Sequence, residues 1–162
     1  MLQRIAQFKL ALICCLFLAV AACSKKATNN LDAGMGAAPG SEQEFATVVG
    51  DRVYFLEDQS TLTGEAQETL RRQAAWLKKY PDVTVQVEGH ADERGTREYN
   101  IALSARRATA TREFLVSQGI KASRIASIAY GKERPVALCD AESCWSQNRR
   151  AVTVITGGAK TS

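Results

Sequence analysis

Apolar and polar positions change their spacing along the chain from residue 45 onward, and the changes predict alternating strands and helices. Val83, Val85 and Val87 alternate with polar residues, which is typical of a half-buried strand. Another set of apolar residues recurs every three or four positions, as on one face of a helix: Ala66, Leu70, Ala74 and Leu77. The two periods therefore predict a domain that contains both strands and helices.

The order of these elements defines a fold class. Thr63 is suited to cap the start of the first helix, Pro81 to stop it and Gly119 to close the second. The predicted strands cover residues 52–55, 83–89, 125–130 and 151–156, and the predicted helices cover 61–80 and 97–118. This β-α-β-α-β-β order predicts an α/β two-layer sandwich, in which helices cover one face of a small mixed sheet.

The first 22 residues have a different pattern. Arg4 and Lys9 precede an uncharged run from Leu10 to Ala22. The run is shorter than the roughly 20 residues that a membrane-spanning helix needs. A short cationic start, an apolar core and small residues at its end describe a secretory signal peptide. We expect residues 1–22 to be removed.

The end of this segment resembles the lipobox of bacterial lipoproteins, because Val20, Ala21 and Ala22 precede Cys23. The resemblance implies that Cys23 is acylated and becomes the mature N-terminus, where its acyl chains would anchor the protein. Ser24 follows, rather than the Asp that marks inner-membrane retention, which implies the outer membrane. An ordinary signal peptide followed by a chance cysteine is the alternative.

Residues 24–44 contain few large apolar side chains and many Ala, Gly, Asn and Ser. Such a composition cannot bury enough surface to offset the entropy of ordering the chain. We therefore expect residues 23–44 to be a lipidated, flexible tether and residues 45–162 to be the folded domain. At about 3.3 Å per extended residue, the tether could reach roughly 70 Å.

The distribution of charges argues against a nucleic-acid partner, and the cysteines indicate a disulfide. The 162 residues include 21 Lys and Arg against 17 Asp and Glu, and these charges are mixed along the chain. A nucleic-acid binder would gather its basic residues on one face, so no nucleic-acid partner is expected. Removal of the signal peptide leaves Cys139 and Cys144 besides Cys23. In an exported chain this pair indicates a disulfide, and a metal pair is the alternative.

One arginine interrupts the apolar stripe of the second helix. The stripe is predicted to contain Leu103, Arg107, Ala110 with Thr111, and Phe114. A guanidinium stays charged and is costly to bury alone, so we expect an anion to face Arg107, with Asp92 as the candidate. One hypothesis is a structural Arg–Asp pair. The other is a cleft in which Asp92 binds an ammonium and Arg107 a carboxylate of one amino-acid head group.

The segment from Gly89 to Ala108, GHADERGTREYNIALSARRA, resembles the signature of the OmpA-like peptidoglycan-binding domain. The resemblance covers about residues 50–156, and the flanking segments narrow it to lipid-anchored members of that family. It implies that Asp92 and Arg107 bind the ammonium and carboxylate of meso-diaminopimelate in the peptidoglycan stem peptide. The signature's Asn falls on Asn100, which either contacts the ligand or caps the loop.

The loop after the first strand lines the ligand pocket in relatives, which implicates Leu56, Glu57 and Asp58. Many members of the family carry FxFD here, whereas this chain reads Phe55-Leu56-Glu57-Asp58. Asp58 therefore keeps its place among the expected ligand-binding residues, while a role for Glu57 is left open.

No catalytic or metal site can be assembled from the remaining residues. His90 is the only histidine, and with Asp92 and Glu93 it lacks the ligand spacing of a zinc site. We expect its imidazole to be partly buried and to bond the loop. Glu88 and Glu93 could be imagined as the acid pair of a hydrolase, but the sequence does not give their separation.

The sequence thus predicts a non-enzymatic tether without a cofactor, held in the outer membrane through Cys23 and facing the periplasm. The family resemblance implies two kinds of partner, peptidoglycan and the periplasmic protein TolB, with other Tol proteins as further partners. It also implies a role in envelope integrity and cell division. The rival hypotheses are a lipid-anchored cell-wall hydrolase and a pure protein-interaction module.

Overall fold

The computed structural model of the protein describes residues 36–161. The expected signal peptide, Cys23 and the tether as far as residue 35 lie outside the described residues. Within residues 36–161, no helix has the length and apolar character needed to cross a bilayer.

All the strands and both long helices that the spacing predicts are present, and this confirms the α/β fold class. The strands are β1 (Arg52–Tyr54), β2 (Thr84–Gly89), β3 (Ile125–Ala129) and β4 (Arg150–Gly157). The α-helices are α2 (Glu42–Glu44), α3 (Gly64–Lys79), α4 (Arg97–Ser117) and α5 (Glu142–Asn148), with a π-helical turn at Phe45–Gly50 and a 3-10 turn at Ala122–Arg124. As expected, Thr63 caps α3 by accepting a hydrogen bond from Ala66 N at 3.2 Å.

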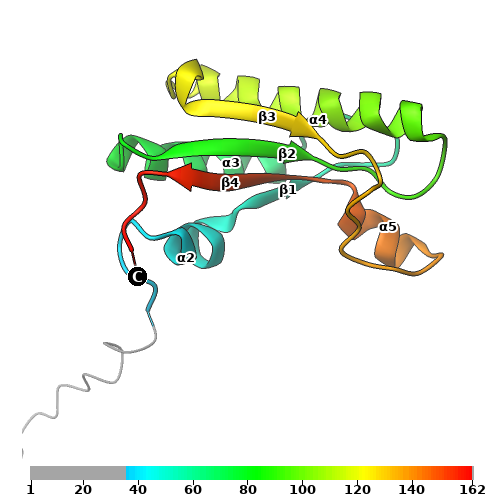
Figure 1. Cartoon of the computed structure of the whole chain (residues 1–162), viewed down its shortest axis with the longest axis horizontal. Helices are drawn as coiled ribbons and strands as arrows, with labels where there is room; N and C mark the ends of the chain where they lie inside the picture. Colours follow the sequence, from blue (N-terminus) through cyan, green and yellow to red (C-terminus); the bar gives the residue numbers. More distant parts are fainter. Residues whose placement is uncertain (1–35, 162) are drawn as a thin grey trace, which may run out of the picture. The chain divides into compact units, whose positions relative to one another are not determined.

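The strands form one mixed sheet in the order β1-β4-β2-β3. β4 pairs antiparallel with both β1 and β2, whereas β2 and β3 are parallel neighbours joined through α4. β1, β2 and β3 therefore run in the same direction. Their carboxyl ends lie at one edge of the sheet, toward the end where Figure 1 shows α5. The loops that follow these three strands are thereby gathered into one region.

The core lies between the sheet and the two long helices. Val85 and Val87 of β2 point into it, while the residues between them are only half-buried. They join a cluster that includes Leu70 and Leu77 of α3 and Leu115 of α4. At the end of β2 the sheet and α4 approach so closely that a Cβ on Gly89 would lie 1.9 Å from the carbonyl oxygen of Ser104. Glycine at this position fixes where the following loop begins.

Contacts with the folded domain begin before residue 45. Ser41 is buried, and its hydroxyl accepts a hydrogen bond from Glu44 N at 3.1 Å as the cap of α2. Glu44 in turn accepts hydrogen bonds at 2.7 Å from Gly40 N and from the indole of Trp76 on α3. The composition of this segment suggested a tether, but the hydrogen bond between Glu44 and Trp76 fastens its end to the domain.

The buried face of α4 differs from the predicted stripe. Leu103, Arg107 and Thr111 are buried as expected, whereas Ala110 and Phe114 are only half-buried. Other buried members of the helix face are Asn100, Ser104, Ala108 and Leu115. The buried face is rotated toward these positions because α4 packs over β2 and β3, with small residues placed where the backbones are close.

Candidate functional site

A pocket of about 230 Å³ lies where the loops after β1 and β2 meet the start of α4. It is lined by Glu57, Asp58, Asp92, Arg94, Gly95, Tyr99, Asn100 and Leu103. Three of the predicted ligand-binding residues, Asp58, Asp92 and Asn100, are therefore brought together. The position agrees with the general rule that open α/β sheets bind ligands beyond the carboxyl ends of their strands.

Asp92 is surrounded by arginine donors. Its carboxylate accepts hydrogen bonds from Arg94 through the backbone N (3.1 Å), Nε (3.3 Å) and Nη2 (2.8 Å), and from Arg149 Nη1 at 3.4 Å. Burial acts to raise the pKa of Asp92, but the hydrogen bonds and charge of Arg94, aided by Arg149, outweigh it and leave the pKa below its ordinary value. Asp92 is consequently an anion at neutral pH.

Arg107 is completely buried and has no direct carboxylate partner among the described residues, so the first of the two hypotheses, a structural Arg–Asp pair between Arg107 and Asp92, is wrong. It donates instead to three carbonyl oxygens: Gln59 O at 2.8 Å, His90 O at 2.9 Å and Leu56 O at 3.2 Å. Its guanidinium also lies 5.2 Å from the centre of the Phe55 ring. Carbonyl dipoles and an aromatic face stabilise the cation where an anion was expected.

Arg107 nevertheless keeps its positive charge despite its burial. Burial lowers its pKa to about 10, and the nearby charges of Asp92 and Asp58 oppose this decrease. The group therefore remains protonated at neutral pH. It also joins the Leu56–Gln59 turn to the start of the loop after β2, so the two walls of the pocket are fastened to one cation.

Asn100 caps the loop, as one of the two hypotheses stated. Its Nδ2 donates to the carbonyl oxygen of Arg94 at 2.7 Å, and the side chain is buried. Lys132 strengthens the same loop by donating to the carbonyl oxygens of Glu93 (2.9 Å) and Gly95 (2.8 Å). Asn100 also lines the pocket, so loop capping and ligand contact are compatible.

Asp58 and Glu57 approach the pocket from the β1 side. Asp58 has a positive φ of 56° and accepts a hydrogen bond from the hydroxyl of Tyr99. This hydrogen bond is the main reason that the pKa of Tyr99 is raised. Glu57, whose role the sequence left open, lines the pocket and pairs with Arg94 Nη1 at 2.7 Å. Arg94 is thus shared between Glu57 and Asp92.

His90 differs from the expectation that its imidazole bonds the loop. The side chain is 2% exposed, and neither ring nitrogen has a hydrogen-bond partner in the described part of the chain. The loop is bonded through the backbone, because His90 N donates to Arg150 O at 2.9 Å. Burial, together with Arg150 and Arg134, lowers the pKa of His90 to about 4, so the ring is neutral at pH 7.

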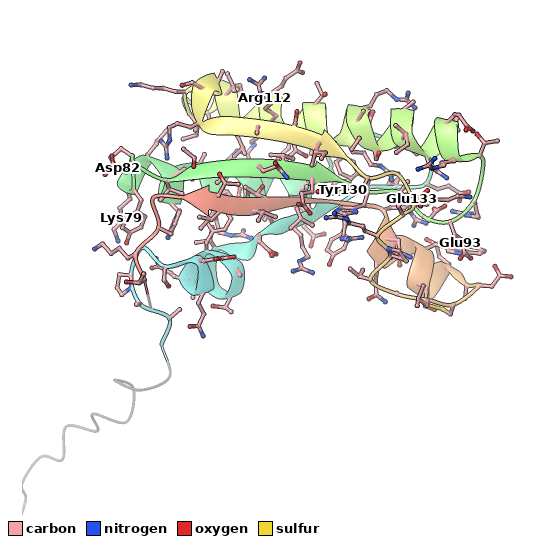
Figure 2. The ribbon with its side chains drawn as sticks, in the orientation of Figure 1. Lys79, Asp82, Glu93, Arg112, Tyr130 and Glu133 are labelled. Atoms are coloured by element: carbon pink, nitrogen blue, oxygen red, sulfur yellow. A yellow bond between two sulfur atoms is a disulfide. The ribbon has the colours of Figure 1, made fainter. Side chains whose placement is uncertain are left out.

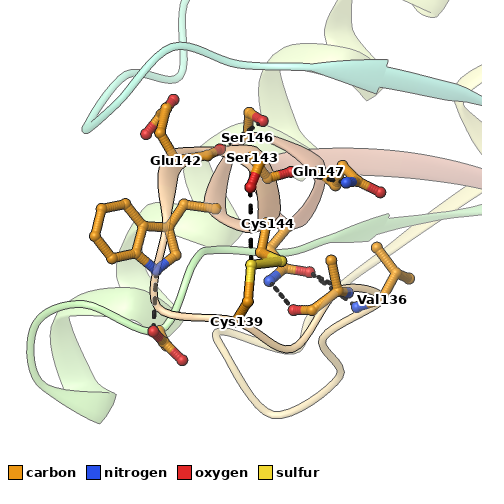
Figure 3. Close-up of a disulfide and its surroundings, with 11 residues drawn as sticks. Val136, Cys139, Glu142, Ser143, Cys144, Ser146 and Gln147 are labelled. Atoms are coloured by element: carbon orange, nitrogen blue, oxygen red, sulfur yellow. Dashed lines mark hydrogen bonds between the residues drawn. A yellow bond between two sulfur atoms is a disulfide. The ribbon is translucent and has the colours of Figure 1, made fainter.

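The sequence analysis missed α5 and the residues that it contributes to this region. Cys139 and Cys144 form the expected disulfide, which fastens α5 to the loop before it (Figure 3). The indole of Trp145 donates to Glu93 at 2.9 Å and lies 4.2 Å from the guanidinium carbon of Arg94. Figure 2 shows Glu93 at the α5 end of the sheet. The amphipathic signal of a seven-residue helix was too short to recognise.

A second cavity has a volume of about 500 Å³. It is lined by Tyr54, Phe55, Leu56, Thr63, Glu65, Glu142, Ser146, Gln147 and Arg149. None of the predicted ligand-binding residues lines it. Over residues 36–161, no group of three or more His, Cys, Asp or Glu side chains is arranged to hold a metal ion.

Comparison with known proteins agrees with this fold and site. The family model described as the OmpA family matches residues 54–150, which is more than half of the chain and includes the whole pocket. The chain belongs to the OmpA family.

Within this family, the relatives of the chain are peptidoglycan-associated lipoproteins, which confirms the resemblance seen in the sequence. The peptidoglycan-associated lipoprotein of Brucella melitensis is 53% identical over 165 residues, which cover 98% of each chain. The crystal structure of the Burkholderia pseudomallei protein of the same name is 37% identical, has a TM-score of 0.66, and covers 68% of this chain and 96% of that chain. The cell wall anchor of the Pseudomonas aeruginosa T6SS is 28% identical, with a TM-score of 0.56 and coverage of 67% and 80%.

Proposed function

We propose that the chain is an outer-membrane lipoprotein that binds peptidoglycan non-covalently through the diaminopimelate of the stem peptide. The observation that carries the proposal is that the ionised Asp92 lines the pocket, while the buried cation of Arg107 lies behind it, bonded to carbonyls of the two loops that form the pocket and to no described carboxylate. A zwitterionic amino-acid head group complements this pair. Its ammonium is suited to Asp92 and its carboxylate to Arg107.

The pocket lining favours entry of an ammonium first. Glu57, Asp58 and Asp92 bring three carboxylates against the single guanidinium of Arg94. The Arg94 side chain is one-third exposed, so it can leave the Asp92 carboxylate and remain paired with Glu57. An arriving ammonium then takes its place on Asp92.

Access to the buried Arg107 requires a movement of the turn after β1. Two of its three acceptors, Leu56 O and Gln59 O, belong to the turn after β1. A ligand carboxylate that displaces these carbonyls exchanges a neutral acceptor for an anion, and charge-assisted hydrogen bonds of this kind are roughly twice as strong. Arg107 also has N–H donors beyond the three that are used.

The lipid anchor and the cell-wall site together would make the chain a tether between the outer membrane and peptidoglycan. The lipobox at Cys23 and the names of the relatives support the anchor. The related fold of a cell wall anchor supports the other end. We place the protein in the Tol–Pal system, with TolB as its periplasmic partner and envelope integrity and cell division as its roles.

A protein-interaction module is the second candidate function. Large apolar side chains are exposed beside the pocket: Tyr54, Leu56, Tyr99 and Ile101. They offer a contact surface of the kind that a protein partner such as TolB needs. Because Leu56 and Tyr99 belong to the turn and the pocket, such a partner would compete with the stem peptide.

Binding is favoured over catalysis by the state of the pocket carboxylates. A glycosidase acid must hold its proton at neutral pH, which requires a raised pKa. The pKa of Asp92 is lowered instead, because Arg94 and Arg149 outweigh its burial. Asp92 is suited to hold a cation, and we propose that the protein is not an enzyme.

A pulldown with two kinds of purified peptidoglycan tests the binding mechanism. We expect retention on diaminopimelate-type peptidoglycan and little on the lysine-type, whose stem residue lacks the second carboxylate. Asp92→Asn should reduce retention by at least roughly tenfold, since a charge-assisted contact contributes about 1.5–3 kcal/mol. Equal binding to both types would refute the head-group mechanism.

The anchor is tested separately with Cys23→Ser. Serine cannot accept the thioether-linked diacylglycerol, so a fatty-acid probe should label the wild-type protein and not the variant. Label that persists on the variant would refute the lipobox hypothesis while leaving the peptidoglycan site untouched.

A further inference from the structure

The segment from Val136 to Asn148 is a small closed unit at the pocket end of the sheet. Asn148 ties its two ends together, because Oδ1 accepts from Val136 N at 2.8 Å and from Ala137 N at 3.2 Å, while Nδ2 donates to Ala137 O at 2.8 Å (Figure 3). The Cys139–Cys144 disulfide is a second link within the same unit and joins α5 to the loop before it.

This unit has little apolar packing of its own. None of the buried core residues in the described part of the chain comes from it, and the side chains of Val136 and Leu138 are exposed. A segment without core contacts depends on its crosslink and polar bonds to keep one conformation. The disulfide is therefore a main constraint on the position of α5.

Two side chains of α5 each contact an arginine that also bonds Asp92. The indole of Trp145 lies 4.2 Å from the guanidinium carbon of Arg94. The carboxylate of Glu142 accepts from Arg149 Nη1 at 3.1 Å and makes a second contact with Arg149 Nη2.

The same two arginines are the side-chain partners of Asp92. Arg94 Nη2 lies 2.8 Å and Arg149 Nη1 3.4 Å from the same carboxylate oxygen of Asp92. Each guanidinium thus lies between Asp92 on one side and an α5 group on the other. Each guanidinium carries one positive charge, which it shares between Asp92 and the α5 side chain. The more strongly the α5 side chain attracts the guanidinium, the more weakly that guanidinium binds Asp92.

We propose that α5 is a positioning element of the Asp92 site, in which Trp145 and Glu142 compete with Asp92 for Arg94 and Arg149 and so keep its carboxylate available to a ligand ammonium. The proposal rests on the proposed binding of an amino-acid head group at Asp92. Without Glu142, Arg149 has Asp92 as its one remaining carboxylate partner among the described residues. Without Trp145, the guanidinium of Arg94 loses the aromatic ring that it contacts on α5.

The disulfide makes this positioning sensitive to thiols. A dithiol reductant gives the Cys139–Cys144 bond two electrons and two protons, leaving two thiols, and is itself oxidised to a disulfide. Once the crosslink is broken, α5 is held by polar bonds alone. Reduction of the folded protein should therefore weaken binding of the ammonium at Asp92 without any substitution in the pocket.

Isothermal titration of the processed protein with a diaminopimelate-containing stem peptide tests the proposal. We expect Glu142→Gln and Trp145→Leu each to weaken binding by about three- to tenfold, which lies within the range in which residues that do not touch a ligand modulate its affinity. Trp145→Phe keeps an aromatic face and should restore most of the loss. Dithiothreitol should weaken binding by the wild-type protein to a similar extent, and Cys139→Ser/Cys144→Ser should show the same loss without reductant.

Glu68→Gln is the matched control. Glu68 is 59% exposed against 61% for Glu142, and it pairs with Arg71 on α3, away from Asp92. This variant should bind within twofold of wild type. The proposal is overturned if the folded Glu142→Gln and Trp145→Leu variants and the reduced wild-type protein all bind within twofold of the oxidised wild type. Failure of the oxidised wild-type protein to bind the peptide would instead overturn the proposed function itself.

Discussion

Two arginines at opposite ends of the sheet are bonded in the same way but differ in what surrounds them. Arg107 donates to the carbonyl oxygens of Leu56, Gln59 and His90. Arg124 donates to three other carbonyl oxygens: Val83 O at 2.8 Å, Tyr80 O at 2.9 Å and Leu77 O at 3.0 Å. Figure 2 shows Asp82, whose charge acts on Arg124, at the end of the sheet opposite Glu93.

The difference lies in the elements that supply the acceptors. Leu77 and Tyr80 belong to the end of α3, where a cation is favoured by the helix dipole and caps free carbonyls. Leu56 and Gln59 belong to a turn that lines a pocket containing Asp58 and Asp92. Hydrogen bonds from backbone carbonyls therefore stabilise the cation in both places, although Arg107 is fully buried and Arg124 only partly so. Such bonding becomes a candidate binding device only where the acceptors can move and a ligand has room.

The largest expected effect is that of Arg107→Ala. It leaves three carbonyl acceptors without their donor, and each unsatisfied buried group costs about 1–3 kcal/mol, so unfolding free energy should fall by about 3 kcal/mol or more. Stem-peptide binding should weaken by at least roughly tenfold. Thermal melting and calorimetric titration measure the two effects. Wild-type affinity in a folded Asp92→Ala/Arg107→Ala variant would place the binding site elsewhere.

The carbonyl of His90 bonds Arg107, while its ring must stay uncharged beside other arginines. Burial, Arg150 and Arg134 lower the pKa of His90 from 6.5 to about 4. Between these pH values, His90 is therefore protonated in the unfolded chain and neutral in the folded chain. Stability should therefore decrease as the pH falls from 6.5 to 4, by about 3 kcal/mol at most. His90→Phe removes the titration, so urea unfolding should show a smaller decrease for this variant. Equal slopes would contradict the prediction.

Asp92 separates the two arginine sites electrostatically, because its charge acts on Arg107 and not on Arg124. Asp92→Asn should weaken stem-peptide binding by roughly tenfold. The pKa of Asp92 is below its ordinary value of 3.8, so its contribution to stability is complete above about pH 4 and is lost as the pH falls further. Acid unfolding below pH 4 should be less steep in the variant. An unchanged acid limb would show that Arg94 and Arg149 do not favour the ionised form.

The smallest effect on function is expected for Arg124→Ala. Loss of its three carbonyl contacts should cost about 1–2 kcal/mol in unfolding free energy, because the group is only partly buried. Peptide affinity should stay within twofold of wild type. A large loss of affinity would break the comparison, because it would show that carbonyl-bonded arginines affect binding through general stability.

The sequence was sufficient for much of the fold because period, caps and breakers are local. The long helices begin and end where Thr63, Pro81 and Gly119 predict. The alternation of Val83, Val85 and Val87 identifies the strand β2. The short α5 was not predicted, because seven residues around a disulfide carry no clear period. The ordering of Ser41 and Glu44 was also missed, since it depends on contacts with Trp76 and Gly40.

The residue types of the candidate site also followed from the sequence, whereas their pairing did not. A buried arginine in an apolar stripe and an aspartate in the preceding loop indicate a charged site, and the structure places Asp58, Asp92 and Asn100 around one pocket. Which group satisfies Arg107 depends on three carbonyls contributed by two loops. No sequence pattern reports the direction in which a loop carbonyl points.

By itself, the sequence determined the order of the strands and long helices and the presence of both charges, and it indicated the disulfide pair, since these depend on local spacing and residue chemistry. Tertiary structure decided that Arg94 and Arg149, rather than Arg107, contact Asp92, and that α5 holds both of them. The physical reason is that β1, β2 and β3 run in one direction. Their loops, and the start of β4, therefore meet at one edge, where residues up to 94 positions apart share hydrogen bonds.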